Sequence, residues 1–138
     1  MRALVVDDEL TSRILLQETL ARYGDVETCE DGAEAVETCL RAISENRPYE
    51  IICMDIMMPG MSGLDALQRI RQEEERAGRQ RSDGAKVIMI TAKDDSESIA
   101  KSFQQLCDAY LTKPVDMRDL LNILHCLCPL PEPEPAKA

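Results

Sequence analysis

Aromatic residues and long apolar runs are scarce in this sequence. Aromatics make up 3% of the 138 residues and tryptophan is absent, so aliphatic side chains must supply the core. The 44% of hydrophobic residues is nevertheless typical of a globular domain and argues against a disordered chain. No apolar run approaches the roughly 20 residues that cross a membrane, and the N-terminal apolar stretch is too short for a signal peptide. We therefore expect a cytoplasmic protein with no membrane insertion.

Basic residues are outnumbered, and the cysteines lack a paired spacing. Lysine and arginine total 16 against 26 aspartates and glutamates, a formal net charge of −10. Such a chain lacks the basic face that phosphate contacts require, so we expect no direct nucleic-acid binding. A basic partner face or a cation held by carboxylates fits the charge better. The six cysteines, without a secretion signal, are expected to be reduced and mostly buried.

Short apolar runs alternate with helical patterns along the chain, whose length suits one domain. Five strands and five helices are predicted in strict alternation. Because the strands are continuous apolar runs, the sheet is expected to be parallel and covered on both faces, which is an α/β, doubly wound fold. Strands are expected at 3–6, 26–29, 51–54, 87–90 and 109–112, and helices at 10–23, after Asp31, from Leu64, after Asp94 or Asp95, and around 120–127.

Helical spacing also predicts which side chains are buried. The acidic and basic run 71–85 is expected to be a solvated face, either extending the third helix or forming a loop. In the last helix, Met117 and Leu121 are either an exposed partner contact or part of a broad core stripe.

We expect one domain over residues 1–128 and a disordered, proline- and glutamate-rich tail or linker over 129–138. The first helix is predicted from the helical spacing of its apolar residues, which are Leu10, Ile14, Leu15, Leu20 and Tyr23.

Polar residues follow the predicted strands at the point where each one ends. Asp7 and Asp8 follow the first strand, Asp55 the third, Thr91 the fourth, and Lys113 comes just after the fifth. The carboxyl ends of parallel strands form the ligand-binding edge of such a sheet. Three crowded carboxylates repel one another, which raises their pKa values or recruits a cation. Carboxylate oxygens suit a hard divalent ion, so the sequence predicts a Mg²⁺ site.

The same residues suit phosphoryl transfer to a carboxylate. Asp55 has a second oxygen free to act as a nucleophile toward phosphorus, and aspartyl phosphate formation is established covalent chemistry. Lys113 supplies a positive charge for the phosphoryl oxygens, and Thr91 supplies a hydroxyl hydrogen bond. A backbone carbonyl just after Asp55 can add a ligand to the cation.

Four motifs in order resemble the receiver domain of two-component response regulators, over about residues 2–128. The resemblance implies that a sensor histidine kinase phosphorylates Asp55, with Mg²⁺ held by Asp7, Asp8, Asp55 and the backbone carbonyl of Met57. It also implies a Thr91–Tyr110 switch pair, a phosphoryl-contacting Lys113, a cis peptide bond before Pro114, and the flavodoxin-like, CheY-like strand order 2-1-3-4-5. The motifs are residues 5–9 (VVDDE), 54–63 (MDIMMPGMSG), 90–92 (ITA) and 110–114 (YLTKP).

The resemblance further implies a phosphorylation-dependent signalling module. Phosphorylation is expected to reshape the surface formed by the fourth helix, the fifth strand and the fifth helix, which then binds a protein partner. The chain would catalyse only its own phosphorylation and dephosphorylation. Two alternatives stay open: a relay intermediate that passes the phosphoryl group to a histidine phosphotransfer protein, and a receiver from a longer regulator with an output domain. A haloacid-dehalogenase-like hydrolase needs an aspartate where Met57 stands.

Overall fold

The computed structural model describes residues 1–79, 83–92 and 106–128. Strands and helices alternate along these segments, and each helix starts at a side chain that accepts backbone hydrogen bonds, namely Glu9, Asp31, Ser62 or Asp116. The elements are β1 (Arg2–Val6), α1 (Leu10–Ala21), β2 (Asp25–Cys29), α2 (Gly32–Ser44), β3 (Ile51–Asp55), α3 (Gly63–Arg76), β4 (Lys86–Thr91), β5 (Ala109–Thr112) and α5 (Met117–Leu127).

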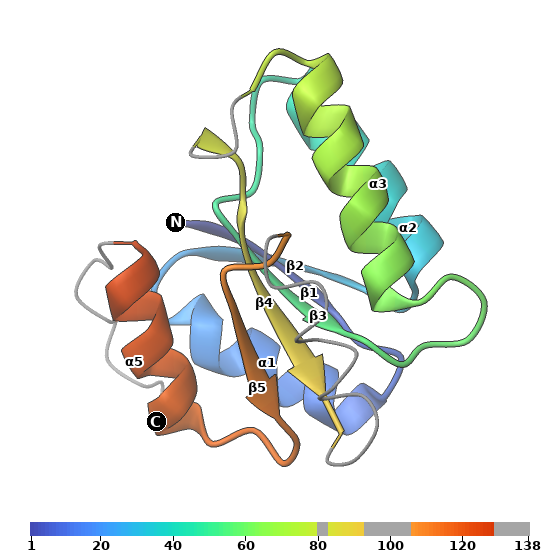
Figure 1. Ribbon diagram of the computed structural model, residues 1–138. Coiled ribbons are helices and arrows are strands. Elements are labelled where there is room, and N and C mark those ends of the chain that lie inside the picture. Colours follow the sequence, from blue (N-terminus) through green and yellow to red (C-terminus); the bar gives the residue numbers. More distant parts are fainter. Residues whose placement is uncertain (80–82, 93–105, 129–138) are drawn as a thin grey trace.

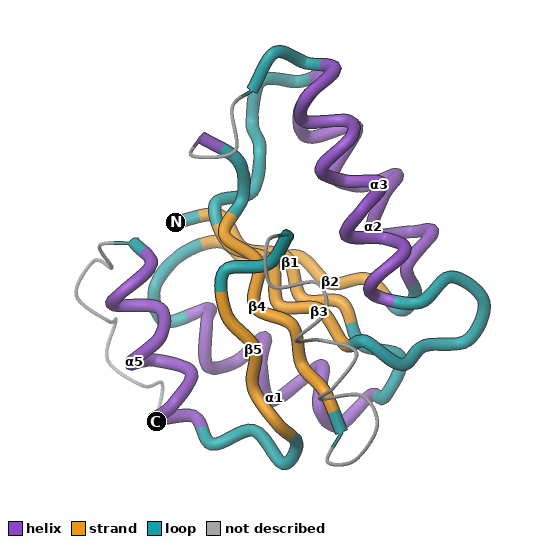
Figure 2. Tube along the Cα trace, viewed as in Figure 1, coloured by secondary structure: helices purple, strands orange, loops and turns teal. Residues whose placement is uncertain are grey.

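The strands form one parallel sheet in the order β2-β1-β3-β4-β5, which confirms the predicted α/β fold and strand order. Figure 2 shows the strands at the centre with helices on both sides. The central strand β3 is buried along its whole length, whereas the edge strands β2 and β5 are partly exposed. The expected helix after Asp94 or Asp95 falls mostly on residues 93–105, which lie outside the described residues.

Helices cover both faces of the sheet and enclose two separate cores. Figure 1 shows α2 and α3 on one face and α1 and α5 on the other. Side chains alternate between the faces along each strand, so Met54 belongs to the core under α2 and α3, and Cys53 to the core under α1 and α5. Met117 and Leu121 are half-buried against the second core, so the core-stripe alternative is the correct one.

Only part of the apolar pattern that predicted α1 faces the core. Leu16 and Leu20 are buried, but Leu10, Ile14 and Leu15 are 58%, 42% and 48% exposed. The helix carries two apolar stripes, and helical periodicity alone does not reveal which of them packs on the sheet.

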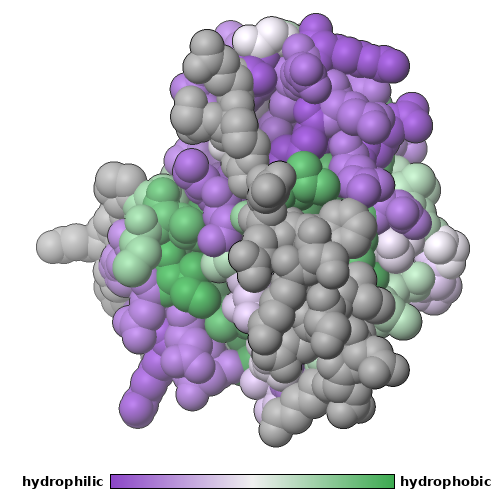
Figure 3. Space-filling view, viewed as in Figure 1, coloured by the Kyte–Doolittle hydropathy of each residue, from purple (hydrophilic) through white to green (hydrophobic). Residues whose placement is uncertain are grey.

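The charged run 71–85 was also interpreted incorrectly in part. The third helix extends through Arg76, and Figure 3 shows a largely hydrophilic surface over α3, as expected. Two charged residues of this run, Arg71 and Glu74, are nevertheless buried. A buried ion pair between them offsets the cost of taking both charges out of water.

Four of the six cysteines are buried, namely Cys29, Cys39, Cys53 and Cys107. Within the described segments, no helix combines the length and apolarity needed to span a membrane.

Candidate functional site

Three aspartates meet at the carboxyl end of the sheet. Asp7 and Asp8 directly follow β1, and Asp55 is the last residue of the neighbouring strand β3. Asp7 is fully buried, Asp55 is 4% exposed, and Asp8 is exposed. One carboxylate oxygen from each residue lies within 4.8 Å of the other two. The fold therefore brings together the carboxylates that the sequence singled out, two buried and one open to solvent.

The backbone around Asp55 fixes the direction of its side chain. The Met57 N–H donates to Asp55 Oδ1 at 3.2 Å, and the Ile56 N–H donates to the Ile90 carbonyl at 2.9 Å. Gly63, the first residue of α3, lies directly behind Asp55: a Cβ atom there would overlap the Asp55 carbonyl. The absence of a side chain at Gly63 thus lets α3 start against the end of β3.

Asp7 is held on one side and incompletely satisfied on the other. Its Oδ1 accepts a hydrogen bond from the Glu9 N–H at 2.9 Å, and its backbone carbonyl accepts one from Arg13 at 2.9 Å. Its buried Oδ2 has no hydrogen-bond partner in the described part of the chain, although Lys113 Nζ is 3.4 Å away. A buried carboxylate oxygen in this state is a favourable ligand for a cation.

Lys113 brings a positive charge into contact with two of the three aspartates. It follows β5, where its N–H donates to the Thr91 carbonyl at 2.7 Å. Its Nζ lies 3.1 Å from Asp55 Oδ2, in a hydrogen-bonded ion pair. The Lys113–Pro114 peptide bond is cis.

Burial and the neighbouring charges shift both partners of this ion pair. Burial raises the pKa of Asp55 to about 6; Lys113 opposes this shift, and the Asp7 carboxylate adds to it. Burial alone would lower the pKa of Lys113, but the carboxylates of Asp55 and Asp7 raise it above its ordinary value. Burial and neighbouring carboxylates therefore both act on the site, and a hard divalent cation would relieve the crowding of negative charge.

Thr91 and Tyr110 lie on neighbouring strands beside the site. Thr91 is fully buried and its hydroxyl donates to the Ala92 carbonyl at 3.0 Å. Tyr110 pairs with Met89, two residues before Thr91, and is half-buried against the core under α2 and α3. The two side chains are therefore diagonal neighbours on one face of the sheet.

Sequence reasoning missed three residues that shape the site: Glu9, Arg13 and Gly63. Glu9 caps α1 by accepting hydrogen bonds from the N–H groups of Thr11 and Ser12. Hydrogen bonding by the Ser12 side chain, together with these backbone bonds, lowers the pKa of Glu9 to about 2. An acidic residue directly before an apolar helix was an available signal for this cap. Neither the Arg13 contact nor the role of Gly63 has a local signal, because each depends on how α1 or α3 docks.

Apolar surface borders the acidic pocket. The large hydrophobic side chains that are exposed among the described residues are Leu10, Ile14 and Leu15 of α1 and Met57 after β3. A cavity of about 420 Å³ opens between α1 and the segment that joins β5 to α5. Its lining includes Leu15, Ile90, Pro114 and Met117, together with Asp7 and Lys113.

The sequence model of the response regulator receiver domain matches residues 3–125. "Probable histidine kinase 2" of Oryza sativa subsp. indica is 33% identical over 138 residues, which cover 93% of this chain and 13% of the kinase. "Regulatory protein VanRB" of Enterococcus faecalis is 34% identical over 131 residues, which cover 92% of this chain and 52% of that protein. The chain therefore spans about half or less of the length of these relatives.

A solved structure shares the fold. The receiver domain of the histidine kinase CKI1 from Arabidopsis thaliana, crystallised in complex with Mg²⁺ and BeF₃⁻, superimposes with a TM-score of 0.75 at 28% identity. The match covers 91% of this chain and 88% of that domain.

Proposed function

The chain belongs to the family of response regulator receiver domains, and on this premise we propose that Asp55 accepts a phosphoryl group from a sensor histidine kinase. An Asp55 oxygen would attack the phosphorus, the bond between phosphorus and the kinase imidazole would break, and the imidazole would leave with a proton. The product is an acyl phosphate on Asp55. The observation that carries the proposal is the convergence of Asp7, Asp8, Asp55 and Lys113 at one edge of the sheet.

The donor set fits Mg²⁺. Asp7, Asp8 and Asp55 offer oxygen atoms only, and the unpartnered Asp7 Oδ2 gives a reason for a cation to bind. The carbonyl of Met57 is proposed as a further ligand. When bound, the ion would neutralise negative charge on the carboxylates and on the transferred group. The CKI1 receiver domain, which was crystallised with Mg²⁺, supports this assignment by similarity.

The remaining residues of the site would bind the phosphoryl group and couple its presence to a conformational change. Lys113 already contacts Asp55 and would turn to the phosphoryl oxygens, and the Thr91 hydroxyl would exchange its bond to the Ala92 carbonyl for one to the phosphoryl group. Movement of Thr91 would free space for its diagonal neighbour Tyr110. The surface around β5 and α5 would then favour a second conformation that binds a protein partner.

The exposed apolar residues beside the site suit contact with the kinase. Leu10, Ile14 and Leu15 lie on α1, which begins two residues after Asp8, and Met57 lies two residues after Asp55. Apolar area near a reactive carboxylate lets a donor protein bury surface while it presents its phosphohistidine.

Residues 1–128 are proposed as the receiver domain and 129–138 as a tail or linker. Six cysteines without a paired spacing support the proposed cytoplasmic location, and the acidic charge supports a protein rather than a nucleic-acid partner.

The chain is proposed to catalyse only its own phosphorylation and dephosphorylation. A relay role is the second candidate, because a relative at 33% identity is named a histidine kinase rather than a regulator. The two roles differ in the step after phosphorylation. Transfer from Asp55 to a histidine phosphotransfer domain would mark a relay, whereas stronger partner binding without transfer would mark an effector.

Incubation with Mg²⁺ and acetyl phosphate, followed by intact-mass measurement, tests the central step. We expect a single phosphoryl adduct on the wild-type protein, none on Asp55→Asn, and none with EDTA. The matched control is Asp65→Asn, since Asp65 is an exposed aspartate in the first turn of α3. Absence of an adduct on folded wild-type protein, or equal adduct formation by Asp55→Asn, would contradict the proposal.

A further inference from the structure

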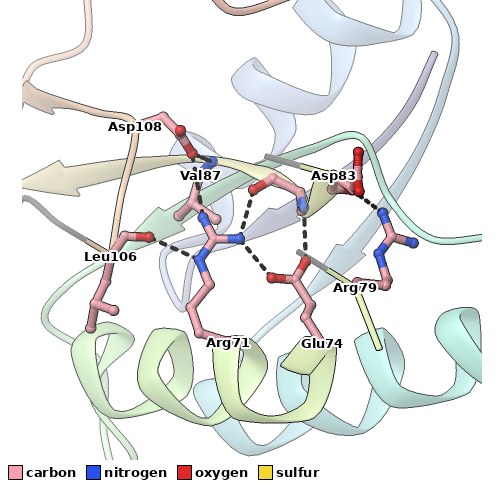
Figure 4. A network of polar contacts seen from close by, with 8 residues as sticks. Arg71, Glu74, Arg79, Asp83, Val87, Leu106 and Asp108 are labelled. Carbon is pink, nitrogen blue, oxygen red and sulfur yellow. Dashed lines mark hydrogen bonds and ion pairs between the residues drawn. The ribbon is translucent and has the colours of Figure 1, made fainter. Parts of the chain in front are cut away.

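A buried arginine ties α3 to the start of β5, at the end of the sheet opposite to Asp55 (Figure 4). The Arg71 side chain is 8% exposed. Its Nε donates to the Leu106 carbonyl at 2.9 Å, and its Nη2 donates to Asp108 Oδ2 at 3.3 Å. Both acceptors belong to the short segment directly before β5, so this guanidinium fixes the point where the strand begins.

The same guanidinium is anchored on its other side. Its Nη1 donates to Glu74 Oε1 and to the Ala85 carbonyl, both at 2.8 Å. Glu74 Oε2 in turn accepts the Ala85 N–H at 2.8 Å. One buried cation therefore connects α3, the segment before β4 and the segment before β5. Fixing register is the best-attested role of such buried ionic groups.

The strand β5 is one whose register needs to be fixed. It has four residues, forms an edge of the sheet, and is only half-buried along its length. Hydrophobic patterning specifies register weakly in a strand that has no fully buried face. Here Asp108 is clamped to Val87 twice: the Asp108 N–H donates to the Val87 carbonyl, and the Val87 N–H donates to Asp108 Oδ2, both at 2.8 Å. This clamp precedes the paired residues Ile88 and Ala109.

Register at the start of β5 decides where Lys113 lies at its end. The ladder runs from Ala109 to Thr112, and the Lys113 N–H then bonds the Thr91 carbonyl. A slip by one residue would turn each side chain to the opposite face of the sheet. The Lys113 ammonium would then leave the positions 3.1 Å from Asp55 Oδ2 and 3.4 Å from Asp7 Oδ2.

We propose that Arg71 is a positioning residue for Lys113: together with Asp108 it locks the register of β5 and thereby holds the Lys113 ammonium at Asp55. The functional part of this inference rests on the proposed phosphoryl transfer to Asp55. The structural part does not, and the two are tested separately.

Amide hydrogen exchange tests the lock without any phosphorylation. We compare Asp108→Ala and Arg71→Lys with Glu75→Gln, which removes an exposed carboxylate from the same helix. The first two should speed exchange of the Lys113 N–H roughly tenfold and leave the Ile56 N–H, which bonds the neighbouring Ile90 carbonyl, nearly unchanged. Glu75→Gln should leave both unchanged. Unaltered exchange at Lys113, or equal acceleration at Ile56, would overturn the lock.

Adduct formation with acetyl phosphate tests the link to Lys113. Asp108→Ala, which removes the accepting oxygen, should slow it roughly threefold to tenfold in the wild-type background and not at all in a Lys113→Met background. An equal slowing in both backgrounds would overturn the positioning role, because Asp108 would then act by another route. If Lys113→Met forms no adduct, the amide hydrogen exchange of the Lys113 N–H decides whether Arg71 and Asp108 hold Lys113 in place. If the wild-type protein forms no adduct while exchange follows the expected pattern, the proposed function fails and the lock stands.

Discussion

At the scale of single residues, Asp7 lowers the stability of the fold because its charge is buried, and it lies at the centre of the site. Its carboxylate is fully buried, lies among other carboxylates, and has one oxygen without a hydrogen bond in the described part of the chain. An unsatisfied buried polar group costs about 1–3 kcal/mol. Stability sacrificed at one position is common where a site must bind a charged ligand, so Asp7 is a residue at which function and stability should oppose each other.

Replacement of Asp7 by asparagine should stabilise the protein in the absence of divalent cations. The amide keeps an oxygen for the Glu9 N–H and removes a charge that repels Asp55. We expect the free energy of unfolding, measured with urea in EDTA, to rise by about 1 kcal/mol. Asp25→Asn, an exposed position at the start of β2, should change it by less than about 0.5 kcal/mol. A clear loss of stability in Asp7→Asn would show that the ion pair with Lys113 outweighs the repulsion.

At the scale of secondary structure elements, the cap of α1 gives a dependence on pH. Glu9 accepts two backbone N–H groups, and its pKa falls to about 2 from an ordinary value of 4.5. A carboxylate with a lowered pKa in the folded state stabilises the protein above its unfolded pKa. That contribution is lost as the pH falls from about 4.5 to about 2.

The expected consequence is a difference between wild type and Glu9→Gln that depends on pH. The wild-type protein should melt at a higher temperature than Glu9→Gln at pH 6, and the gap should close as the pH falls through this window. Thermal melts followed by circular dichroism measure both. Glu37→Gln removes an exposed carboxylate from the middle of α2 and serves as the control. A gap of constant size down to pH 2 would mean that the Glu9 charge does not cap the helix.

Elements also show where sequence reasoning succeeds and where it stops. The strands were predictable because they are short apolar runs, or in β2 an alternating pattern, between turn residues. The strand ends followed because polar residues mark them. The buried face of α1 was not predictable, since Leu10 and Leu16 belong to two stripes that look equivalent before the helix docks. The buried state of Arg71 was equally hidden: its partners Leu106 and Asp108 lie more than thirty residues away.

At the scale of the whole molecule, net charge complicates any test of cation binding. The chain carries a formal charge of −10, so every added salt screens repulsion and raises stability to some extent. A specific site differs from screening in two ways. Its effect saturates with concentration, and it depends on individual carboxylates rather than on the total charge.

Magnesium should therefore raise the melting temperature beyond the effect of sodium chloride at equal ionic strength. A ligand at about ten times its Kd stabilises the folded state by about 1.4 kcal/mol, which is a shift of roughly 5 °C for a domain of this size. Asp8→Asn should remove the excess, because Asp8 is one of the three converging carboxylates and is exposed enough to be replaced without cost to the core. Asp25→Asn removes the same unit of charge far from the site and should keep the excess. If both variants respond to Mg²⁺ alike, total charge and not the site accounts for the stabilisation.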